Sequence, residues 1–190
     1  MKEKIKSQIK DSIIIKNKML ESCIEDIKVA AEIMIKSLKN NGKILWCGNG
    51  GSAADAQHLS TELMGSMSNY DRKPIPSIAL TTDSSFITAW SNDTGFESVF
   101  SRQIQGLGNK NDTLIGISTS GNSENVIAAI KQAKYKNLFT VTLTGKTGGI
   151  LKDLSDITIN IPSENTQRVQ EAHIMVGQIL CDLVEDEFLD

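Results

Sequence analysis

A histidine and a glutamate in this sequence are spaced to act together on a bound molecule. His58 and Glu62 lie four residues apart in a stretch that is rich in Ala, Gln, Leu and Glu and therefore favours a helix. Four residues correspond to about 400° of helical rotation, so both side chains project from one face. An imidazole and a carboxylate placed beside a ligand can carry out acid–base chemistry. A His/Glu pair at this spacing is also common on protein surfaces without any function, so the neighbouring residues are needed to distinguish the two interpretations.

The residues before this pair form a glycine-rich turn, residues 48–52, which we call the first turn. It is Gly-Asn-Gly-Gly-Ser and follows the apolar run Ile44–Cys47, which is typical of a buried strand. A strand, a glycine turn and a helix together leave free backbone N–H groups that can hold an anion. The alternative is a tight connection without a ligand. The third glycine of a dinucleotide-binding fingerprint is absent from this turn.

A second polar turn, residues 118–123, has the sequence Ser-Thr-Ser-Gly-Asn-Ser and also follows an apolar run. Hydroxyls and backbone N–H groups at the start of a helix can hold a phosphate without a formal positive charge. The Gly-Lys-Ser/Thr ending of a P-loop is missing, which disfavours a nucleoside triphosphate. A helix N-cap with spare serines is the alternative. Four hydroxyls in six residues exceed what capping requires, so we favour the phosphate.

Strands and helices alternate after a helical N-terminal stretch. Periodicity predicts a helix over residues 3–38, with a break allowed near 21–26. Strands are expected at residues 44–47, 77–81, 112–117, 138–143 and 156–161, and helices from 53 to 65, at 83–90, 97–107, 124–135 and 167–188, with a short helical turn at 150–154 and a polar turn at 92–96. This order predicts an α/β fold, with a doubly wound, five-stranded parallel sheet flanked by helices. Ligands of such sheets bind at the carboxyl ends of the strands.

Length and composition restrict the class of protein. A chain of 190 residues suits one domain, residues 1–190, and residues 1–40 carry more apolar surface than a small sheet can bury, which favours a role in oligomerisation. The net charge of −3 without a basic block argues against nucleic-acid binding. Three scattered cysteines, a charged N-terminus and no long apolar run predict a cytoplasmic protein that does not bind membranes.

Several sequence blocks resemble one known family. CGNGGSAADAQHLSTEL, SNDTGFE, GISTSGNS, TLTGK and RVQEAHI occur in the order and spacing of the phosphoheptose isomerases, and the likeness runs from about residue 40 to 185. These sugar isomerase (SIS) domain enzymes convert sedoheptulose 7-phosphate to D-glycero-D-manno-heptose 7-phosphate, the first step toward ADP- or GDP-heptose for lipopolysaccharide or capsule. The resemblance implies a homotetramer with shared active sites, in which the N-terminal helix packs between subunits, and one zinc ion per subunit.

The resemblance also implies roles for individual residues. Asn49, Gly50 and Gly51 would line the substrate, Ser118, Thr119, Ser120 and Ser123 would grip its phosphate with Ser52 nearby, and Asn92 and Asp93 would contact its hydroxyls. His58, Glu62 and Gln170 would be zinc ligands, Glu62 and Gln170 also touching the substrate. The family places a histidine eight residues after the glutamine, as metal ligand and acid/base, whereas this chain has Gln178. An amide is a poorer zinc ligand and cannot shuttle protons at neutral pH.

The mechanism implied is proton transfer between two sugar carbons through an enediol. We assign the carbon base to Glu62, while the second acid/base position is Gln178. One alternative is a non-catalytic SIS-domain scaffold that binds the bacterial replication initiator, but such proteins lack a glutamate at position 62. Another is a sugar-phosphate-sensing module of a transcription regulator, which the absence of a helix-turn-helix segment or a basic patch disfavours. A third is an isomerase of another phosphosugar.

Overall fold

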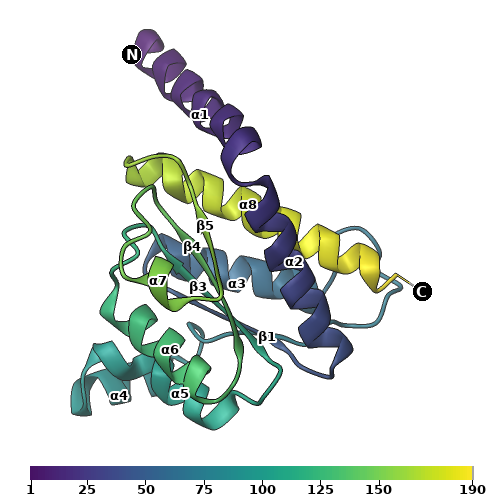
Figure 1. Cartoon of the computed structure of the whole chain (residues 1–190). Coiled ribbons are helices and arrows are strands. Elements are labelled where there is room, and N and C mark those ends of the chain that lie inside the picture. Colours follow the sequence, from purple (N-terminus) through teal and green to yellow (C-terminus); the bar gives the residue numbers. More distant parts are fainter. Residues whose placement is uncertain (190) are drawn as a thin grey trace.

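Five parallel strands form one sheet in the computed structural model of the chain, which describes residues 1–189 (Figure 1). The strands are β1 (Ile44–Gly48), β2 (Ser77–Ala79), β3 (Thr113–Ser118), β4 (Phe139–Thr144) and β5 (Ile157–Asn160), in the order β2-β1-β3-β4-β5. Every residue of β1 and β3 is buried, as expected for parallel strands that are covered on both faces. The chain moves outward from β1 to β2 and then returns to β3, so the winding direction reverses between β1 and β3.

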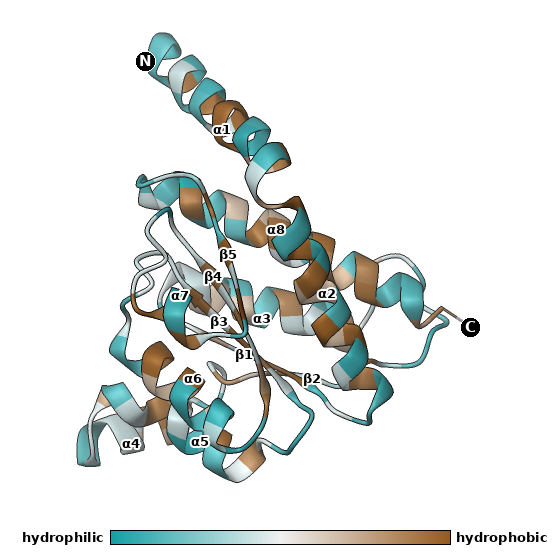
Figure 2. Ribbon diagram, in the orientation of Figure 1, coloured by the Kyte–Doolittle hydropathy of each residue, from teal (hydrophilic) through white to brown (hydrophobic). Residues whose placement is uncertain are grey.

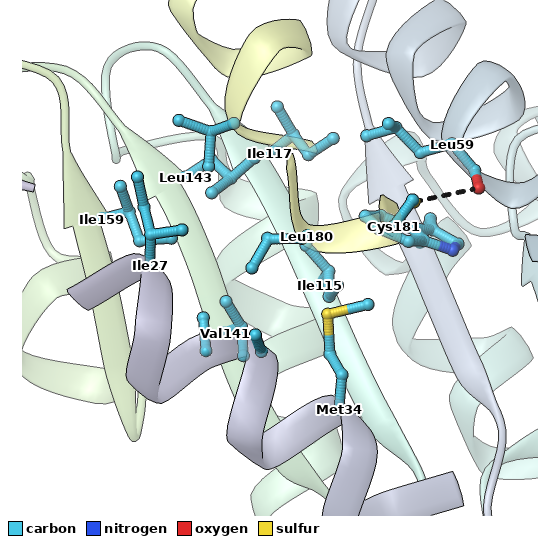
Figure 3. Packing of buried hydrophobic residues seen from close by; sticks show 14 of the residues in the cluster. Ile27, Met34, Leu59, Ile115, Ile117, Val141, Leu143, Ile159, Leu180 and Cys181 are labelled. Atoms are coloured by element: carbon cyan, nitrogen blue, oxygen red, sulfur yellow. Dashed lines mark hydrogen bonds between the residues drawn. The ribbon is translucent and has the colours of Figure 1, made fainter. Parts of the chain in front are cut away.

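Helices cover both faces of this sheet, which confirms the doubly wound fold. They are α1 (Lys2–Ser22), α2 (Ile24–Lys39), α3 (Gly51–Met64), α4 (Ser84–Asp93), α5 (Val99–Leu107), α6 (Glu124–Tyr135), α7 (Leu151–Leu154) and α8 (Thr166–Glu187), with a 3-10 turn at Phe96–Ser98. Because side chains alternate along a strand, Ile115 and Ile117 pack with α2, α3 and α8 (Figure 3), and Leu114 packs with α5 and α6.

The N-terminal helical stretch is divided at Cys23, within the predicted range for a break. Cys23 is fully buried and has φ −119°, which separates α1 from α2. While α2 packs on the sheet, α1 extends away from it (Figure 1), and Met19 is its buried residue. Ile5, Ile9 and Ile13 recur at four-residue intervals on α1 and are all more than half exposed. Along α1, hydrophobic and hydrophilic segments alternate (Figure 2).

The prediction of a polar turn at residues 92–96 was partly wrong. Asn92 and Asp93 belong to the last turn of α4, and the helix is followed by its C-cap Thr94 and by Gly95, the latter with φ +115°. The start of α4 was predicted correctly, since the Asp83 carboxylate accepts from the Phe86 backbone N–H. In residues 1–189, no helix has both the length and the apolar character required to cross a bilayer.

Candidate active site

The two polar turns lie next to each other where the winding of the sheet reverses. The first turn follows β1 and the second follows β3, and these strands are paired with Gly48 opposite Ile117. Asn49 of the first turn exchanges two hydrogen bonds of 2.8 Å with Asn125, which lies in the first helical turn of α6. Ligands of open parallel sheets bind at this kind of reversal, at the carboxyl ends of the strands.

The second turn gathers hydroxyls at the start of α6. The Ser118 Oγ lies 2.9 Å from the Ser123 Oγ and 3.5 Å from the Ser120 Oγ. Thr119 and Ser120 line a polar cavity of about 330 Å³ together with Lys146, whose Nζ donates to the Glu164 carboxylate at 3.1 Å. The structure therefore brings together three of the four predicted phosphate-binding hydroxyls, with the fourth lining the adjoining cavity.

Gln170 of α8 lies against the start of α3. Its Nε2 donates to the Ser52 Oγ at 3.4 Å and to the Asp55 carboxylate at 3.3 Å. Gly51 permits this approach, because a Cβ there would be 2.5 Å from the same Nε2 atom. Gly50, with φ +56°, immediately precedes α3. Asp55 was not predicted, although its spacing of three residues from Ser52 places both on one helical face.

The pair predicted from sequence spacing is formed on the second half of α3. The His58 Nε2 lies 2.8 Å from the Glu62 Oε1, and the Glu62 side chain is 17% exposed against 48% for His58. Beside them, Leu59 packs so closely on Gly177 of α8 that a Cβ at Gly177 would be 2.3 Å from the Leu59 Cδ1. Gln178 is the next residue and is partly exposed. Because α3 and α8 touch here, Gln178 belongs to the helix that flanks the His58–Glu62 pair.

Asn92 and Asp93 are not joined to this group of residues by hydrogen bonds within the described part of the chain. Both are exposed at the end of α4, and the Asn92 amide donates to the Asp93 carboxylate at 2.8 Å. Their predicted contact with substrate hydroxyls stays a prediction.

A buried ion pair fixes the chain that follows α3. The Arg72 Nε donates to the Glu185 carboxylate at 2.6 Å, and both side chains are 1% exposed. Arg72 also donates through Nη2 to the Glu62 backbone carbonyl at 2.8 Å. Glu185 accepts further bonds from Ser66 and from the Ser68 backbone N–H. Burial alone would raise the pKa of Glu185, but these hydrogen bonds and the Arg72 charge lower it to about 2.

Known proteins resemble this chain over most of its length. The family model described as "SIS domain" matches residues 9–145. A phosphoheptose isomerase of Nitratiruptor is 54% identical over 162 residues, covering 85% of this chain and 86% of that protein. The chain belongs to the phosphoheptose isomerase family. A solved phosphoheptose isomerase from Neisseria gonorrhoeae has a TM-score of 0.92 at 42% identity, covering 97% of this chain and 98% of that one, and one from Francisella tularensis has 0.93 at 38%, covering 97% of each.

A single chain offers few strong donors for the zinc ion that the resemblance to phosphoheptose isomerases implies. Catalytic zinc sites usually have three protein ligands from His, Cys, Asp and Glu. No group of three such residues suited to a metal gathers anywhere in residues 1–189. His58 and Glu62 supply two donors, while the amide nitrogen of Gln170 is bonded to Ser52 and Asp55. The donors of one chain therefore do not by themselves fit a tight zinc site.

The second histidine of the chain, His173, is part of the core and not of the candidate site. His173 is fully buried on α8, its Nε2 lies 3.2 Å from the Thr144 carbonyl oxygen, and its Nδ1 has no hydrogen-bond partner. Burial lowers its pKa from 6.5 to about 4, against a smaller opposing effect of the Thr144 bond. His173 is therefore neutral at pH 7 and does not replace the acid/base group that Gln178 lacks.

Acid should destabilise the protein in two successive ranges of pH. The unfolded chain binds a proton on His173 near pH 6.5, whereas the folded chain does so only near pH 4, so stability falls as the pH is lowered between these values. The loss expected from His173 is roughly 3 kcal/mol. For Glu185, stability is present above pH 4.5 and is lost toward pH 2. Urea unfolding at pH 7, 5.5 and 4.5 measures the first range, and an unchanged free energy of unfolding would contradict the assignment.

Proposed function

We propose that this protein is a sedoheptulose 7-phosphate isomerase, which forms D-glycero-D-manno-heptose 7-phosphate in the cytoplasm for lipopolysaccharide or capsule. The observation that carries the proposal is the Glu62 carboxylate, held 2.8 Å from His58 on the helix that starts at the first turn. The second turn, with its clustered hydroxyls, lies beside the first through the pairing of β1 and β3. The second turn lies at the carboxyl edge of the sheet, whereas Glu62 lies near the far end of α3, so the proposal combines the two through active sites that are shared between subunits.

In the proposed isomerisation each of these residues has a defined role. Hydroxyls of Ser118, Ser120 and Ser123 and the start of α6 bind the phosphate, and this remote binding orients the other end of the open-chain sugar. Glu62 removes a proton from C1 of the ketose to give an enediol, and the proton is returned to C2. The hydroxyl proton of O1 moves to O2, which leaves a carbonyl at C1. Gln178 cannot carry that proton at neutral pH, so water or another side chain takes this part.

The proposal includes a zinc ion and names its donors. No step of the mechanism depends on this ion. His58 and Glu62 would be its strong ligands, and the amide oxygens of Gln170 and Gln178 its weak ones, with the two glutamines coming from different subunits because about 12 Å of α8 separates them in one chain. A bound zinc ion would polarise the carbonyl and hydroxyl oxygens of the sugar.

Exchanging Gln178 for histidine is expected to strengthen zinc binding by roughly 10-fold or more, because imidazole is a better zinc ligand than an amide. Titration of the metal-free protein with zinc, in competition with a chromophoric chelator, measures the affinity. Adding His58→Gln to Gln178→His should remove the gain. Equal zinc affinity in the wild type and in Gln178→His would contradict the proposed ligand set.

We further propose that residues 1–190 form one SIS domain that assembles as a homotetramer with shared active sites. The exposed stripe Ile5, Ile9 and Ile13 on α1 supports this, because apolar surface repeated along a projecting helix is typical of a helix–helix interface. The Arg168 guanidinium anchors α1 to α8 by donating to the Gln8 carbonyl at 2.5 Å, and it also pairs with Glu171. Arg168 and Glu171, which lie on either side of Gln170 in the sequence, are thereby connected to α1.

The proposed function is tested by incubating the purified protein with sedoheptulose 7-phosphate, with and without added zinc, and following formation of the aldose. Conversion in either condition supports the isomerase. A protein that binds the sugar phosphate but never converts it would instead support a non-catalytic SIS-domain scaffold. Conversion of other ketose phosphates at a higher kcat/KM would assign a different phosphosugar.

A further inference from the structure

We propose that Asn125 is a positioning residue, which holds the Asn49 amide in one orientation toward the bound phosphosugar. The inference rests on the proposed function, because Asn49 is a predicted substrate contact of the same site. The two side chains exchange reciprocal hydrogen bonds, Asn49 Nδ2 to Asn125 Oδ1 and Asn125 Nδ2 to Asn49 Oδ1, each of 2.8 Å. Asn125 is 3% exposed, whereas Asn49 is partly exposed.

The pairing leaves Asn49 with a defined set of free hydrogen-bonding groups. A primary amide has two N–H donors and an oxygen with two acceptor sites, and the pair uses one N–H and one acceptor site of each partner. Because both bonds must form together, rotation of the Asn49 amide alone by 180° would place like groups opposite each other and lose both. The second N–H of Asn49 is not used by the pair, and Asn49 is partly exposed, so a ligand can accept this N–H.

The place of the pair in the fold explains why this orientation matters. Asn49 follows β1 and Asn125 follows the second turn, so the two amides join the two polar turns across the reversal of the sheet. A substrate whose phosphate lies on the second turn extends its sugar toward the first turn. A fixed separation of the turns and a fixed amide then set the position of the sugar carbons within the site. Misplacement of reacting atoms by about 1 Å can reduce the rate by about 100-fold.

Alanine substitutions at the two positions, singly and together, test whether Asn125 acts through Asn49. We expect Asn125→Ala to lower kcat/KM by roughly 10- to 100-fold. Asn49→Ala should have at least as large an effect, and the double variant should be no worse than Asn49→Ala alone. Affinity for inorganic phosphate should change little, because the hydroxyls of the second turn remain. Thr158→Val is the matched control, since it removes a buried 2.8 Å hydrogen bond to Thr142 between β4 and β5.

The outcomes separate a positioning residue from a structural one. Multiplying losses in the double variant would overturn the proposal, as would an Asn125→Ala protein that is destabilised like Thr158→Val but keeps its kcat/KM. If the wild type does not convert sedoheptulose 7-phosphate, the proposed function fails, and the same four proteins are compared by their Kd for that sugar phosphate. The positioning role is still supported if Asn125→Ala binds the sugar phosphate more weakly than the wild type and the double variant binds it no more weakly than Asn49→Ala. Absence of binding in the wild type would overturn both proposals.

Discussion

The Glu62→Gln protein is expected to lose isomerase activity by a factor of roughly 100 to 10,000 or more, while it still binds phosphate. Glutamine keeps the size of the side chain and its ability to accept from His58, but it cannot take a proton from the C1 carbon. The hydroxyls proposed to bind phosphate belong to the second turn, and their hydrogen bonds join them to one another and not to Glu62. Kinetics with sedoheptulose 7-phosphate and calorimetry with inorganic phosphate measure the two properties separately.

A matched control for this experiment is Glu32→Gln, which makes the same chemical change on α2. The Glu32 side chain is 62% exposed and lies 4.0 Å from Lys28, so its loss should leave both activity and phosphate affinity unchanged. Full activity in Glu62→Gln would remove Glu62 from the role of carbon base. Loss of phosphate binding together with activity would show that the substitution disturbs α3 as a whole.

Arg72→Met is expected to destabilise the protein by about 3–5 kcal/mol, the cost of leaving one buried charge without its partner. Glu185 would keep its backbone and serine donors but would lose the bond from the Arg72 Nε at 2.6 Å. The Glu62 carbonyl would lose the Nη2 donor at the same time, so activity should fall as well. Urea unfolding at pH 7 gives the free energy of unfolding, and kcat gives the effect on the site.

The double variant Arg72→Met with Glu185→Leu distinguishes the ion pair from simple packing. With both charges removed, no charge remains buried, so much of the lost stability should return. A single variant within about 1 kcal/mol of the wild type would mean that the pair is of the weakly contributing kind that exposed sites show.

Features that depend on short sequence distances could be predicted. Alternating apolar runs indicated the five strands, and the four-residue spacing of His58 and Glu62 indicated a contact that the structure shows at 2.8 Å. The break between α1 and α2 also lies inside the predicted range. The end of α4 was predicted too early, because Asn92 and Asp93 favour turns, whereas in the structure the helix continues through both and ends at Asp93.

Contacts between distant residues could not be predicted. Asn49 and Asn125 are separated by 76 positions, and Arg72 and Glu185 by 113. No local sequence pattern identifies either pair, because the sequence alone does not distinguish a buried Asn or Glu from an exposed one. The position of Gln170 against Ser52 and Asp55 likewise depends on the packing of α8 on α3.

The parallel pairing of β1 with β3 has a consequence for how the chain acquires its ability to bind. Ile44 is opposite Thr113, so the two turns become neighbours only when a long loop of the chain has closed, and loop closure of this kind is slow. No fragment that contains only one of the turns holds the whole candidate site. Capture of ligand is thus an all-or-none property of the folded sheet, and a bound sugar phosphate stabilises the native state as a whole instead of one region of it.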